Sequence, residues 1–422
     1  MTAFLSAPEA ARCLGVSRQT LYAYVSRGLL RAHETDDPRK RRYDAEAVAR
    51  LAQDRRRGRR PKEIAKATLD WGIPVLESAI ATIQDGRLYY RGRDAVTLAR
   101  EATVEDAAAL LWDLPVGDCF GPAAPVFPPA MAVAMPFYAG VPLEDSLLPL
   151  MAMATSDDST AVWRRDRRHL AKGCGALVRV ATASIAGTPP DARPIHLWLG
   201  EAWGLDAAGV DLLRMAIVLC ADHELNASSF TARCVASTGA SLRAAVLGGL
   251  AALSGARHGG MTARIESFWR GLDLGDTRDA LRRRLAAGED PPGFGHPLYP
   301  DGDARARAIL DRILPRFPEA RALVAAAAEL TGRQPNIDFA LVCLRRFLRL
   351  PDGGAFGVFA LGRSIGWIAH ALEQRDTGQL IRPRAVYVGP PIDGVANGVA
   401  NGAAKGTTAG AIVGASPGRR SG

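Results

Sequence analysis

The feature that most constrains the fold is a long stretch, from Trp71 to about Pro390, that is rich in alanine and leucine. It contains few runs of valine, isoleucine and threonine. Alanine and leucine favour helices, whereas β-branched residues favour strands. The chain has 422 residues, of which 48% are hydrophobic, so it can form a large core and two or three domains. The sequence therefore predicts an all-α protein.

The positive charge is concentrated at the N-terminus. The chain has 53 Lys and Arg against 44 Asp and Glu, a net charge of +9. Residues 1–62 hold 15 of these basic residues and 7 of the acidic ones, so this segment alone carries a net charge of +8. Basic segments attract nucleic acid or acidic surfaces. A soluble basic tail is the alternative interpretation.

The cysteines and the N-terminal residues indicate the compartment. The six cysteines are scattered with no C-x-x-C pair, a pattern typical of reduced thiols rather than of a disulfide scaffold or a zinc site. The start lacks a basic region and a long apolar region, so we expect no signal peptide. No apolar run reaches the roughly 20 residues that span a bilayer. We expect a cytoplasmic protein without a metal ion or cofactor.

Residues 1–60 have the pattern of a winged helix-turn-helix domain. S-A-P-E, Ser6–Glu9, is a capping box that begins a short helix, and G-V-S forms a turn before a second helix that Ser17 can cap. A basic segment ending in R-R-Y is compatible with a wing. The order A-A-R-x-L-G-V-S-x-x-T-L-Y-x-Y-x-x-x-G-L-L, then R-R-Y-D, resembles the winged helix-turn-helix of MerR- and excisionase-type proteins.

The residue types in this domain are compatible with binding to double-stranded DNA. Side chains near the start of the second helix could reach base edges or phosphates in a major groove. Basic side chains of the wing could contact phosphates. A small helical module for packing or dimer contacts is the alternative. The candidate DNA-binding residues are Arg18, Gln19, Thr20, Tyr22, Arg39, Lys40, Arg41 and Arg42.

Four segments of the helical stretch combine histidine, aspartate or arginine with glycine or asparagine, where apolar helices begin or end. Taken singly, each such residue is more often structural than catalytic. Composition and spacing alone indicate only an acid–base enzyme for an anionic substrate. The segments are A-D-H-E-L-N-A-S-S-F around His223, S-G-A-R-H-G-G-M-T around His258, P-P-G-F-G-H-P-L-Y-P-D-G-D-A-R with His296 and Arg305, and Q-P-N-I-D-F-A with Asp338; Arg363 and Arg382 follow.

Taken together and in order, these motifs resemble citrate synthase. The resemblance runs from about Leu69 to Gly389 and begins with E-S-A-I-A-T-I-Q-D-G-R-L-Y-Y-R-G-R-D. The helix-turn-helix in front resembles the arrangement in the DNA-binding citrate synthase-like proteins of bacteria. The motifs are D-H-x-L-N-A-S, S-T-G-A, x-x-H-G-G, G-F-G-H, D-x-R-A, N-x-D, G-R-x-x-G-W-I-A-H-x-x-E-Q and I-R-P-R.

The resemblance implies the citrate synthase fold, in which a small helical domain moves over the cleft of a large one. The C-terminal tail consists of small residues that cannot bury enough surface to become ordered. The predicted divisions are a winged helix-turn-helix domain at 1–60, a linker at 61–68, a large domain at 69–260 and 339–390, a small domain at 261–338 and a disordered tail at 391–422.

The resemblance also implies a reaction: condensation of acetyl-CoA or propionyl-CoA with oxaloacetate to citrate or 2-methylcitrate. Asp338 matches the general base that removes a proton from the acyl group. His258 matches the residue that stabilises the enol or enolate oxygen, and the glycines after it would allow close approach. His296 matches the histidine that polarises the ketone of oxaloacetate. The acyl-CoA is a substrate here and not a cofactor.

The remaining matched positions would bind the two substrates. Arginine forks suit the two carboxylates of oxaloacetate better than lysine would. In the family the last arginine comes from the partner subunit, so Arg382 implies a homodimer. The oxaloacetate-binding residues would be His223, His296, Arg305, Arg363 and Arg382. The residues near CoA would be Gly293, Phe294, Gly295 and Asn336.

Two loops depart from the family pattern. Arg257 is a charged residue beside His258, and Pro297 follows His296 where many relatives have arginine. These changes slightly favour an alternative from another class, against which the intact Asp338 and arginines count: a transcription regulator whose synthase-like domain senses a CoA ester or a di- or tricarboxylate with little turnover. Within the chemistry, 2-methylcitrate synthesis and the reverse cleavage of citryl-CoA are further alternatives.

Overall fold

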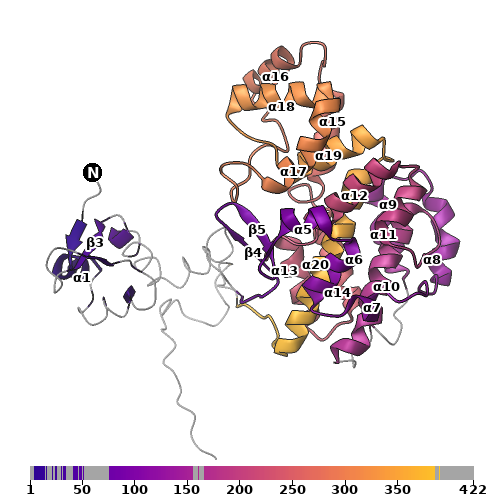
Figure 1. Cartoon of the computed structure of the whole chain (residues 1–422), viewed down its shortest axis with the longest axis horizontal. Coiled ribbons are helices and arrows are strands. Elements are labelled where there is room, and N and C mark those ends of the chain that lie inside the picture. Colours follow the sequence, from indigo (N-terminus) through magenta and orange to yellow (C-terminus); the bar gives the residue numbers. More distant parts are fainter. Residues whose placement is uncertain are drawn as a thin grey trace, which may run out of the picture. The chain divides into compact units, whose positions relative to one another are not determined.

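The computed structural model describes residues 4–14, 16, 21, 24–25, 30, 32–34, 41–45, 47–49, 51, 76–154, 160, 166–384 and 389. Residues Val75–Arg382 form one compact unit (Figure 1), and residues Met1–Pro74 belong to another. The predicted linker at 61–68 and the predicted tail at 391–422 lie outside the described residues.

The N-terminal unit begins with a strand and a short helix. Strand β1 (Phe4–Ser6) leads into helix α1 (Ala7–Leu14), which begins at the predicted capping box. The capping interaction is present, because Glu9 Oε2 accepts hydrogen bonds from Ser6 N at 2.8 Å and from Ser6 Oγ at 2.7 Å. This contact satisfies a donor that the first helical turn leaves free.

The predicted wing is a β-hairpin. Strands β2 (Ala32–Glu34) and β3 (Arg41–Asp44) pair antiparallel, and β1 completes a sheet of order β1-β3-β2. Buried Tyr43 packs this sheet onto α1, while Arg41 and Arg42 are exposed. The other candidate DNA-binding residues lie outside the described residues: Arg18, Gln19, Thr20, Tyr22, Arg39 and Lys40.

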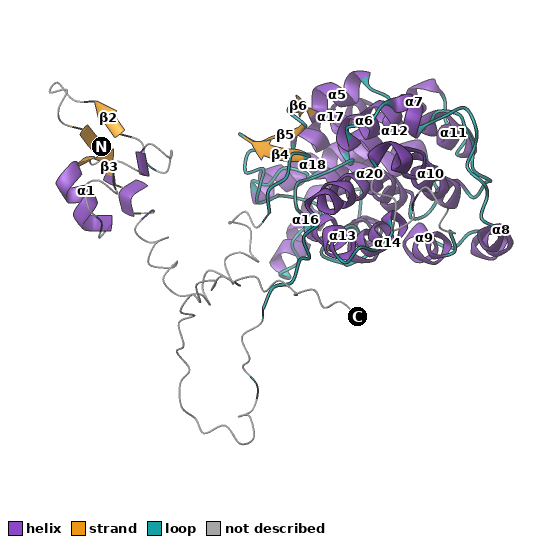
Figure 2. Ribbon diagram, turned by 90° about the horizontal axis from the view of Figure 1, so that it is seen from below, coloured by secondary structure: helices purple, strands orange, loops and turns teal. Residues whose placement is uncertain are grey.

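The second unit is mostly helical (Figure 2), as predicted. The part before the first histidine motif contains α5 (Ala95–Glu101), α6 (Val104–Trp112), α7 (Val116–Cys119), α8 (Pro129–Ala134), the 3₁₀ helix η1 (Met135–Tyr138), α9 (Leu143–Ala152), α10 (Arg167–Ala186), α11 (Ile195–Ala202) and α12 (Ala207–Leu219). The part after it contains α13 (Ala227–Ser237), α14 (Leu242–Leu253), α15 (Met261–Arg270), α16 (Thr277–Ala286), α17 (Ala304–Ile313), the 3₁₀ helix η3 (Leu314–Arg316), α18 (Pro318–Thr331), α19 (Ile337–Leu348) and α20 (Gly354–Thr377).

Helix α20 lies at the centre of this unit. It packs against α10, α12, α13 and α14, and nearly all of its residues are buried. By length and composition α20 could cross a membrane, but its apolar window is entirely buried inside the protein. Close packing requires glycine at Gly249 of α14, since a Cβ there would lie 2.5 Å from Trp367. The position of α20 allows one side chain, Arg363, to be held deep inside the core.

A small antiparallel sheet interrupts the helical unit and was not predicted. It consists of β4 (Ala81–Gln84), β5 (Arg87–Tyr90) and β6 (Arg93–Asp94). The turn between β4 and β5 is Asp85-Gly86, with φ of 51° and 71°, which is the hairpin turn that an Asp-Gly pair favours. The Asp85-Gly86 pair could have predicted this hairpin from the sequence, but the prediction relied on the helical composition of the stretch.

The histidine motifs lie where the helices meet. In Figure 1 helices α15, α16 and α18 gather at one end of the unit, with α17 and α19 between them and the remaining helices. The predicted boundaries of the small domain, 261–338, coincide with the start of α15 and the first turn of α19. The division into a large and a small domain stays a prediction.

Candidate active site

The predicted site residues come from helix ends that are far apart in the sequence. His223, His258 and His296 lie in the connections between α12 and α13, α14 and α15, and α16 and α17, respectively. Arg305 and Asp338 occupy the first turns of α17 and α19. Backbone groups at helix ends lack intrahelical partners, so polar side chains collect there.

His223 and His296 meet around a tyrosine. Their ring centroids are 5.3 Å apart in an edge-to-face arrangement. His223 Nε2 lies 2.9 Å from the hydroxyl of Tyr299, and the Tyr299 ring is 5.1 Å from that of His296. The structure thus brings together two of the predicted oxaloacetate-binding histidines. Sequence reasoning did not single out Tyr299, although it follows His296 within the same motif.

Arg305 is fixed by a carboxylate two residues earlier. Asp303 Oδ1 accepts from Arg305 Nε at 3.0 Å, and Oδ2 accepts from Arg305 Nη2 at 2.8 Å. Both side chains are buried, and burial would lower the pKa of Arg305, but the Asp303 carboxylate reverses this and raises it. Asp303 Oδ2 also accepts from Ile337 N at 3.0 Å, next to Asp338. One carboxylate therefore joins the starts of α17 and α19.

Arg363 is buried in α20 without such a carboxylate fork. Its side chain is 1% exposed, and Nε donates to the carbonyl oxygen of Cys220 at 3.0 Å. Burial lowers its pKa, and the nearby Asp222 carboxylate opposes this shift. The guanidinium carbon lies 5.0 Å from the ring centroid of Phe359. Within the described part of the chain the other N–H donors of Arg363 have no hydrogen-bond partner, so an anionic ligand could occupy them.

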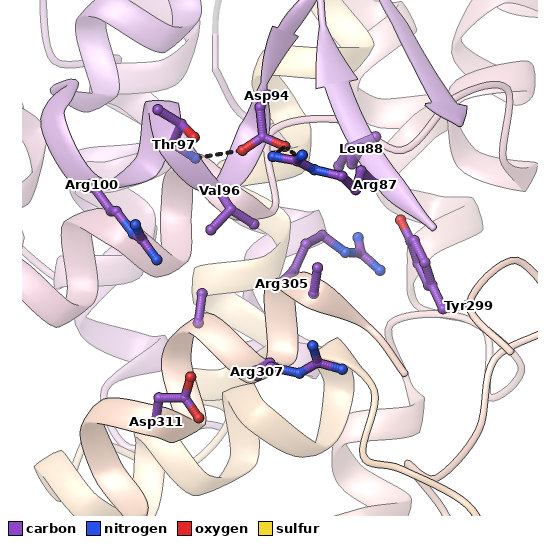
Figure 3. A pocket seen from close by; sticks show the side chains of 12 residues that line it. Arg87, Leu88, Asp94, Val96, Thr97, Arg100, Tyr299, Arg305, Arg307 and Asp311 are labelled. Atoms are coloured by element: carbon purple, nitrogen blue, oxygen red, sulfur yellow. Dashed lines mark hydrogen bonds and ion pairs between the residues drawn. The ribbon is translucent and has the colours of Figure 1, made fainter. Parts of the chain in front are cut away.

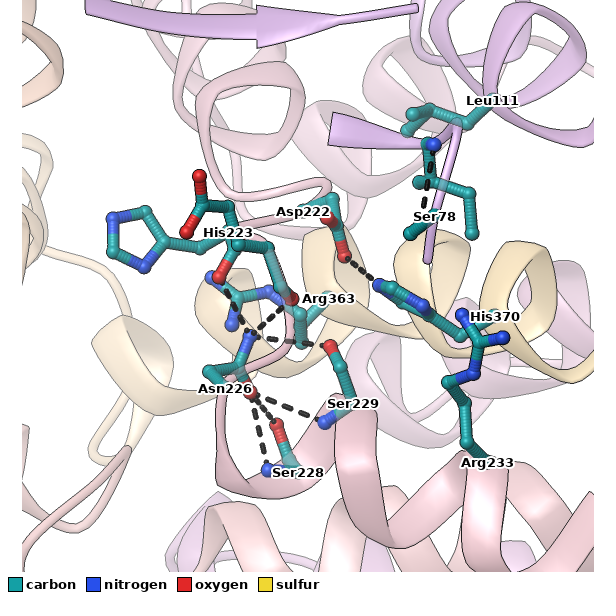
Figure 4. A network of polar contacts seen from close by, with 12 residues as sticks. Ser78, Leu111, Asp222, His223, Asn226, Ser228, Ser229, Arg233, Arg363 and His370 are labelled. Carbon is teal, nitrogen blue, oxygen red and sulfur yellow. Dashed lines mark hydrogen bonds and ion pairs between the residues drawn. The ribbon is translucent and has the colours of Figure 1, made fainter. Parts of the chain in front are cut away.

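His258 lies against Phe359, as Arg363 does. Its ring centroid is 5.9 Å from that of Phe359, the ring over which Arg363 lies. His258 Nε2 lies 2.8 Å from Ser228 Oγ, and Ser228 Oγ lies 2.8 Å from the Asn226 side-chain oxygen (Figure 4). The side chain of Asn226 caps α13. This chain of contacts joins His258 to the loop that carries His223.

The glycines after His258 have a structural reason in their own turn. A Cβ at Gly259 would lie 2.7 Å from Leu253 Cγ, and one at Gly260 would lie 2.8 Å from the Ser254 carbonyl oxygen. The turn that ends α14 thus requires both glycines, whatever ligand approaches. The departures Arg257 and Pro297 are both exposed.

Asp338 has an unusual environment for a carboxylate. The residue is half-buried, its Oδ1 is buried, and no hydrogen-bond partner of that atom is found in the described part of the chain. Burial raises the pKa of Asp338 to about 7, although Arg305 and Arg363 act in the opposite direction. At neutral pH this group therefore exists in both protonation states, as a proton-transfer group requires.

The three histidines are neutral at pH 7. Burial and then nearby Arg305 and Arg363 hold the pKa of His223 well below its usual value. Burial and the charge of Arg363 lower the pKa of His258 to about 3, and burial with Arg305 lowers that of His296 to about 4. Neutral imidazoles can donate one hydrogen bond and accept another.

The residues expected near CoA form two loops that are bonded to each other. Phe294 and Pro335 form an isolated β-bridge, Asn336 N donates to the Gly293 carbonyl oxygen at 2.9 Å, and Asn336 Nδ2 donates to the Gly295 carbonyl oxygen at 3.2 Å. Gly293 has a φ of 86°, and a Cβ there would lie 2.7 Å from Ile265 Cδ1, so glycine is required. The loops border a cavity of about 110 Å³.

The sequence analysis did not predict the buried pair of Asp222 and His370. The carboxylate of Asp222 lies 3.2 Å from His370 Nε2, and both side chains are fully buried (Figure 4). Asp222 precedes His223 and also acts on the pKa of Arg363. Both residues belong to motifs that were recognised, D-H-x-L-N and W-I-A-H, but their contact depends on tertiary structure.

Arg382 is not brought to the other predicted residues within one chain. It is exposed in the segment after α20, and no hydrogen bond or ion pair between it and the other candidate residues is found in the described ranges. Its predicted role in the site of a partner subunit stays a prediction. Within residues 76–154 and 166–384, no three His, Cys, Asp or Glu side chains gather closely enough to hold a metal ion.

Comparison with known proteins decides the family. The family model for the citrate synthase C-terminal domain matches residues 146–384. The chain belongs to the citrate synthase family. Citrate synthase of Haloferax volcanii is 31% identical over 366 residues, covering 75% of this chain and 94% of the relative. The 2-methylcitrate synthase of Mycobacterium tuberculosis is 28% identical over 357 residues, covering 75% and 89%.

Solved structures agree with this assignment. Citrate synthase of Thermoplasma acidophilum, solved as a ternary complex with carboxymethyl coenzyme A and oxaloacetate, has a TM-score of 0.65 and 25% identity. The alignment covers 78% of this chain and 97% of that one. The predicted citrate synthase fold is therefore confirmed. A helix-turn-helix family model matches residues 4–56, so the predicted N-terminal module is confirmed as well.

Proposed function

We propose that this protein condenses a short acyl-CoA with oxaloacetate to form citrate or 2-methylcitrate and CoA. The observation that carries the proposal is Asp338: its buried Oδ1 has no hydrogen-bond partner among the described residues, and burial raises its pKa to about 7, against the charges of buried Arg305 and Arg363. Such a group can remove a weakly acidic proton at neutral pH. The arginines supply charge for a dicarboxylate substrate.

In the proposed reaction Asp338 takes a proton from the carbon next to the thioester carbonyl. The electron pair of the broken C–H bond forms the enol or enolate, whose oxygen His258 stabilises. That carbon then attacks the ketone of oxaloacetate, which His296 polarises by hydrogen bonding, and the ketone oxygen takes up a proton through His296 to become the hydroxyl of the product. Water finally cleaves the thioester and releases CoA. His223, Arg305 and Arg363 hold oxaloacetate, together with Arg382 of the partner subunit in a homodimer.

The Ser228 hydroxyl decides which nitrogen of His258 can act. If Ser228 donates to Asn226, His258 Nε2 must carry the proton and Nδ1 is left without one. If the hydroxyl instead turns and donates to Nε2, Nδ1 carries the proton and can donate to the thioester oxygen. Because Asn226 already accepts from the backbone N of Ser228 and Ser229, the hydroxyl is free to turn.

A thiol-release assay tests the reaction. Oxaloacetate is supplied with acetyl-CoA or propionyl-CoA, and the free thiol of CoA is measured over time. We expect turnover with at least one of these substrates and a loss of about 10²–10⁴-fold in Asp338→Asn, the range for removal of a general base. Exposed Glu319→Gln is the matched control. The absence of turnover by the unmodified protein with both substrates would refute the proposal.

A second candidate function is regulated DNA binding. The helix-turn-helix match and the exposed Arg41 and Arg42 on the β2–β3 hairpin favour it. Both activities can occur in one chain. Each phosphate contact contributes about −0.9 to the slope of log affinity against log salt. The double change of Arg41 and Arg42 to glutamine should therefore make that slope shallower by about 2, and an unchanged slope would exclude these residues from the interface.

A further inference from the structure

A cavity outside the histidine cluster is lined by four arginines. It has a volume of about 240 Å³ and lies between β5, α5 and α17. The guanidinium groups of Arg87, Arg100, Arg305 and Arg307 surround the same space (Figure 3). The predicted roles of the site residues do not use this cavity, although Arg305 and Tyr299 border both.

Two of the four arginines are already neutralised. Asp94 accepts from Arg87 Nε at 3.1 Å and lies 2.9 Å from Nη2, and it also caps α5 through Thr97 N. Arg305 is paired with Asp303, as described above. Asp94 and Asp303 therefore have little capacity to neutralise further cations in the cavity.

Arg100 and Arg307 are the cations that remain. Neither forms an ion pair with any carboxylate of the described residues, and Arg307 Nη2 donates only to the Asp301 carbonyl oxygen, at 3.3 Å. Asp311 also lines the cavity, one helical turn after Arg307. Four arginines and two aspartates line the cavity, and Asp303 adds a third carboxylate, so the net charge around the cavity is +1. Two guanidinium forks on opposite walls are a typical arrangement for an oxyanion.

The sheet that contributes β5 to this cavity is hydrogen-bonded to the candidate active site. Ile83 N of β4 donates to Glu224 Oε1 at 2.5 Å, next to His223. The Tyr90 hydroxyl of β5 lies 3.1 Å from the carbonyl oxygens of Val218 and Leu219, at the end of α12. The opposite wall carries Arg305 itself. A ligand that binds between α5 and α17 would therefore contact the helix that carries Arg305 and would lie beside the sheet that is bonded to the loop of His223.

The geometry points to a regulatory site for a small multivalent oxyanion, either phosphorylated or polycarboxylate. The ligand bridges Arg100 of α5 and Arg307 of α17. The cavity volume of about 240 Å³ lies below the roughly 300–1,000 Å³ of most small-molecule and cofactor pockets, so the ligand should be small. The effect of the ligand on turnover rests on the proposed function, whereas its binding does not.

Calorimetric titration of the full chain with inorganic pyrophosphate and, separately, with tricarballylate tests the binding. We expect at least one of them to bind, and the stronger one identifies the ligand chemistry. Arg100→Gln and Arg307→Gln should each weaken binding at least tenfold. Arg93→Gln, an exposed change on β6 outside the cavity, should leave it unchanged. Thermal unfolding of each variant confirms that it is folded.

Repeating the titration with saturating oxaloacetate separates this cavity from the candidate active site. Binding that persists and still depends on Arg100 supports the proposal. The proposal would be overturned if neither anion gave a binding heat, if the Arg100 and Arg307 variants bound as tightly as the unmodified protein, or if oxaloacetate displaced the anion completely. Because calorimetry requires no turnover, these failures are distinguishable from failure of the proposed condensation. With turnover established, the anion should change the KM for oxaloacetate in the unmodified protein and not in Arg100→Gln.

Discussion

The candidate active site around His223, His296 and Asp338 and the cavity of about 240 Å³ share Arg305 and Tyr299 but differ in how far their charges are removed from water. In the candidate active site Arg305 and Arg363 are at most 2% exposed, and neighbouring groups have strongly shifted pKa values. In the cavity Arg100 and Arg307 are exposed. Buried arginines therefore shift the pKa values of their neighbours strongly, whereas exposed arginines should do so only weakly, because water screens exposed charges.

The largest expected difference concerns two ion pairs. Asp303→Asn leaves the buried guanidinium of Arg305 without a carboxylate, which should lower the free energy of unfolding by about 3 kcal/mol. Glu329→Gln breaks the exposed pair with Arg278 and should have a much smaller effect, because water screens both charges. Urea unfolding measures both. Equal costs would contradict the contrast between buried and exposed charge.

Asp338→Asn should stabilise the protein as it removes activity. The pKa of Asp338 is raised from 3.8 to about 7 in the folded protein. The wild-type carboxyl therefore contributes stability that is complete below about pH 4 and lost as the pH rises through 7. The neutral amide avoids that loss, so the variant should gain roughly 1–4 kcal/mol at pH 8 and little at pH 4. Denaturant unfolding at both pH values checks this, and a variant that is less stable at pH 8 would contradict it.

The pH dependence of kcat/KM should have a single acidic limb near pH 7. Asp338 must be ionised to accept a proton, so the rate should fall about tenfold per unit below its pKa. His258 and His296, with pKa values of about 3 and 4, should add no limb above pH 5. Rates measured from pH 5 to 9 decide. A limb between 5 and 6.5 that disappears in a histidine variant would assign a charged imidazole to the site.

Ser228→Ala should have the smallest effect. The change removes the hydroxyl that can fix the tautomer of His258, at the cost of one hydrogen bond, about 1 kcal/mol. We expect kcat to fall roughly three- to tenfold while the KM for oxaloacetate stays unchanged. Ser254→Ala, an exposed change in the turn before His258, is the control. An effect on KM alone would show that Ser228 positions substrate instead.

Local sequence determined more of the fold than of the site. The start of α1 after Ser6 followed from the capping box. The break after α14 falls at the glycine-rich motif of His258, and the antiparallel pairing of β2 and β3 agrees with the predicted wing. The β4–β5 hairpin was missed, because an Asp-Gly turn weighs little against a helical composition. Its Tyr90 then makes contacts 128 residues away, which no local pattern specifies.

The site shows the same limit more strongly. Residue types and motif order identified Asp338, His258 and Arg305, but their pKa values depend on burial that only the folded core creates. Asp303 is the clearest example. Its place two residues before Arg305 suggests only a helix cap, whereas in the fold it also binds Ile337 N and supports the helix of Asp338. Arg382 cannot be placed by one chain at all, since its predicted partners belong to another subunit.

The central claim is that Asp338 removes a proton from the acyl group. The most direct measurement is exchange of the methyl hydrogens of acetyl-CoA with deuterated water, in the presence of a dicarboxylate that resembles oxaloacetate but has no ketone. Condensation cannot follow, so exchange reports proton removal alone. The account predicts exchange by the unmodified protein, and its loss in Asp338→Asn with folding intact. Exchange at the same rate in both proteins would contradict it.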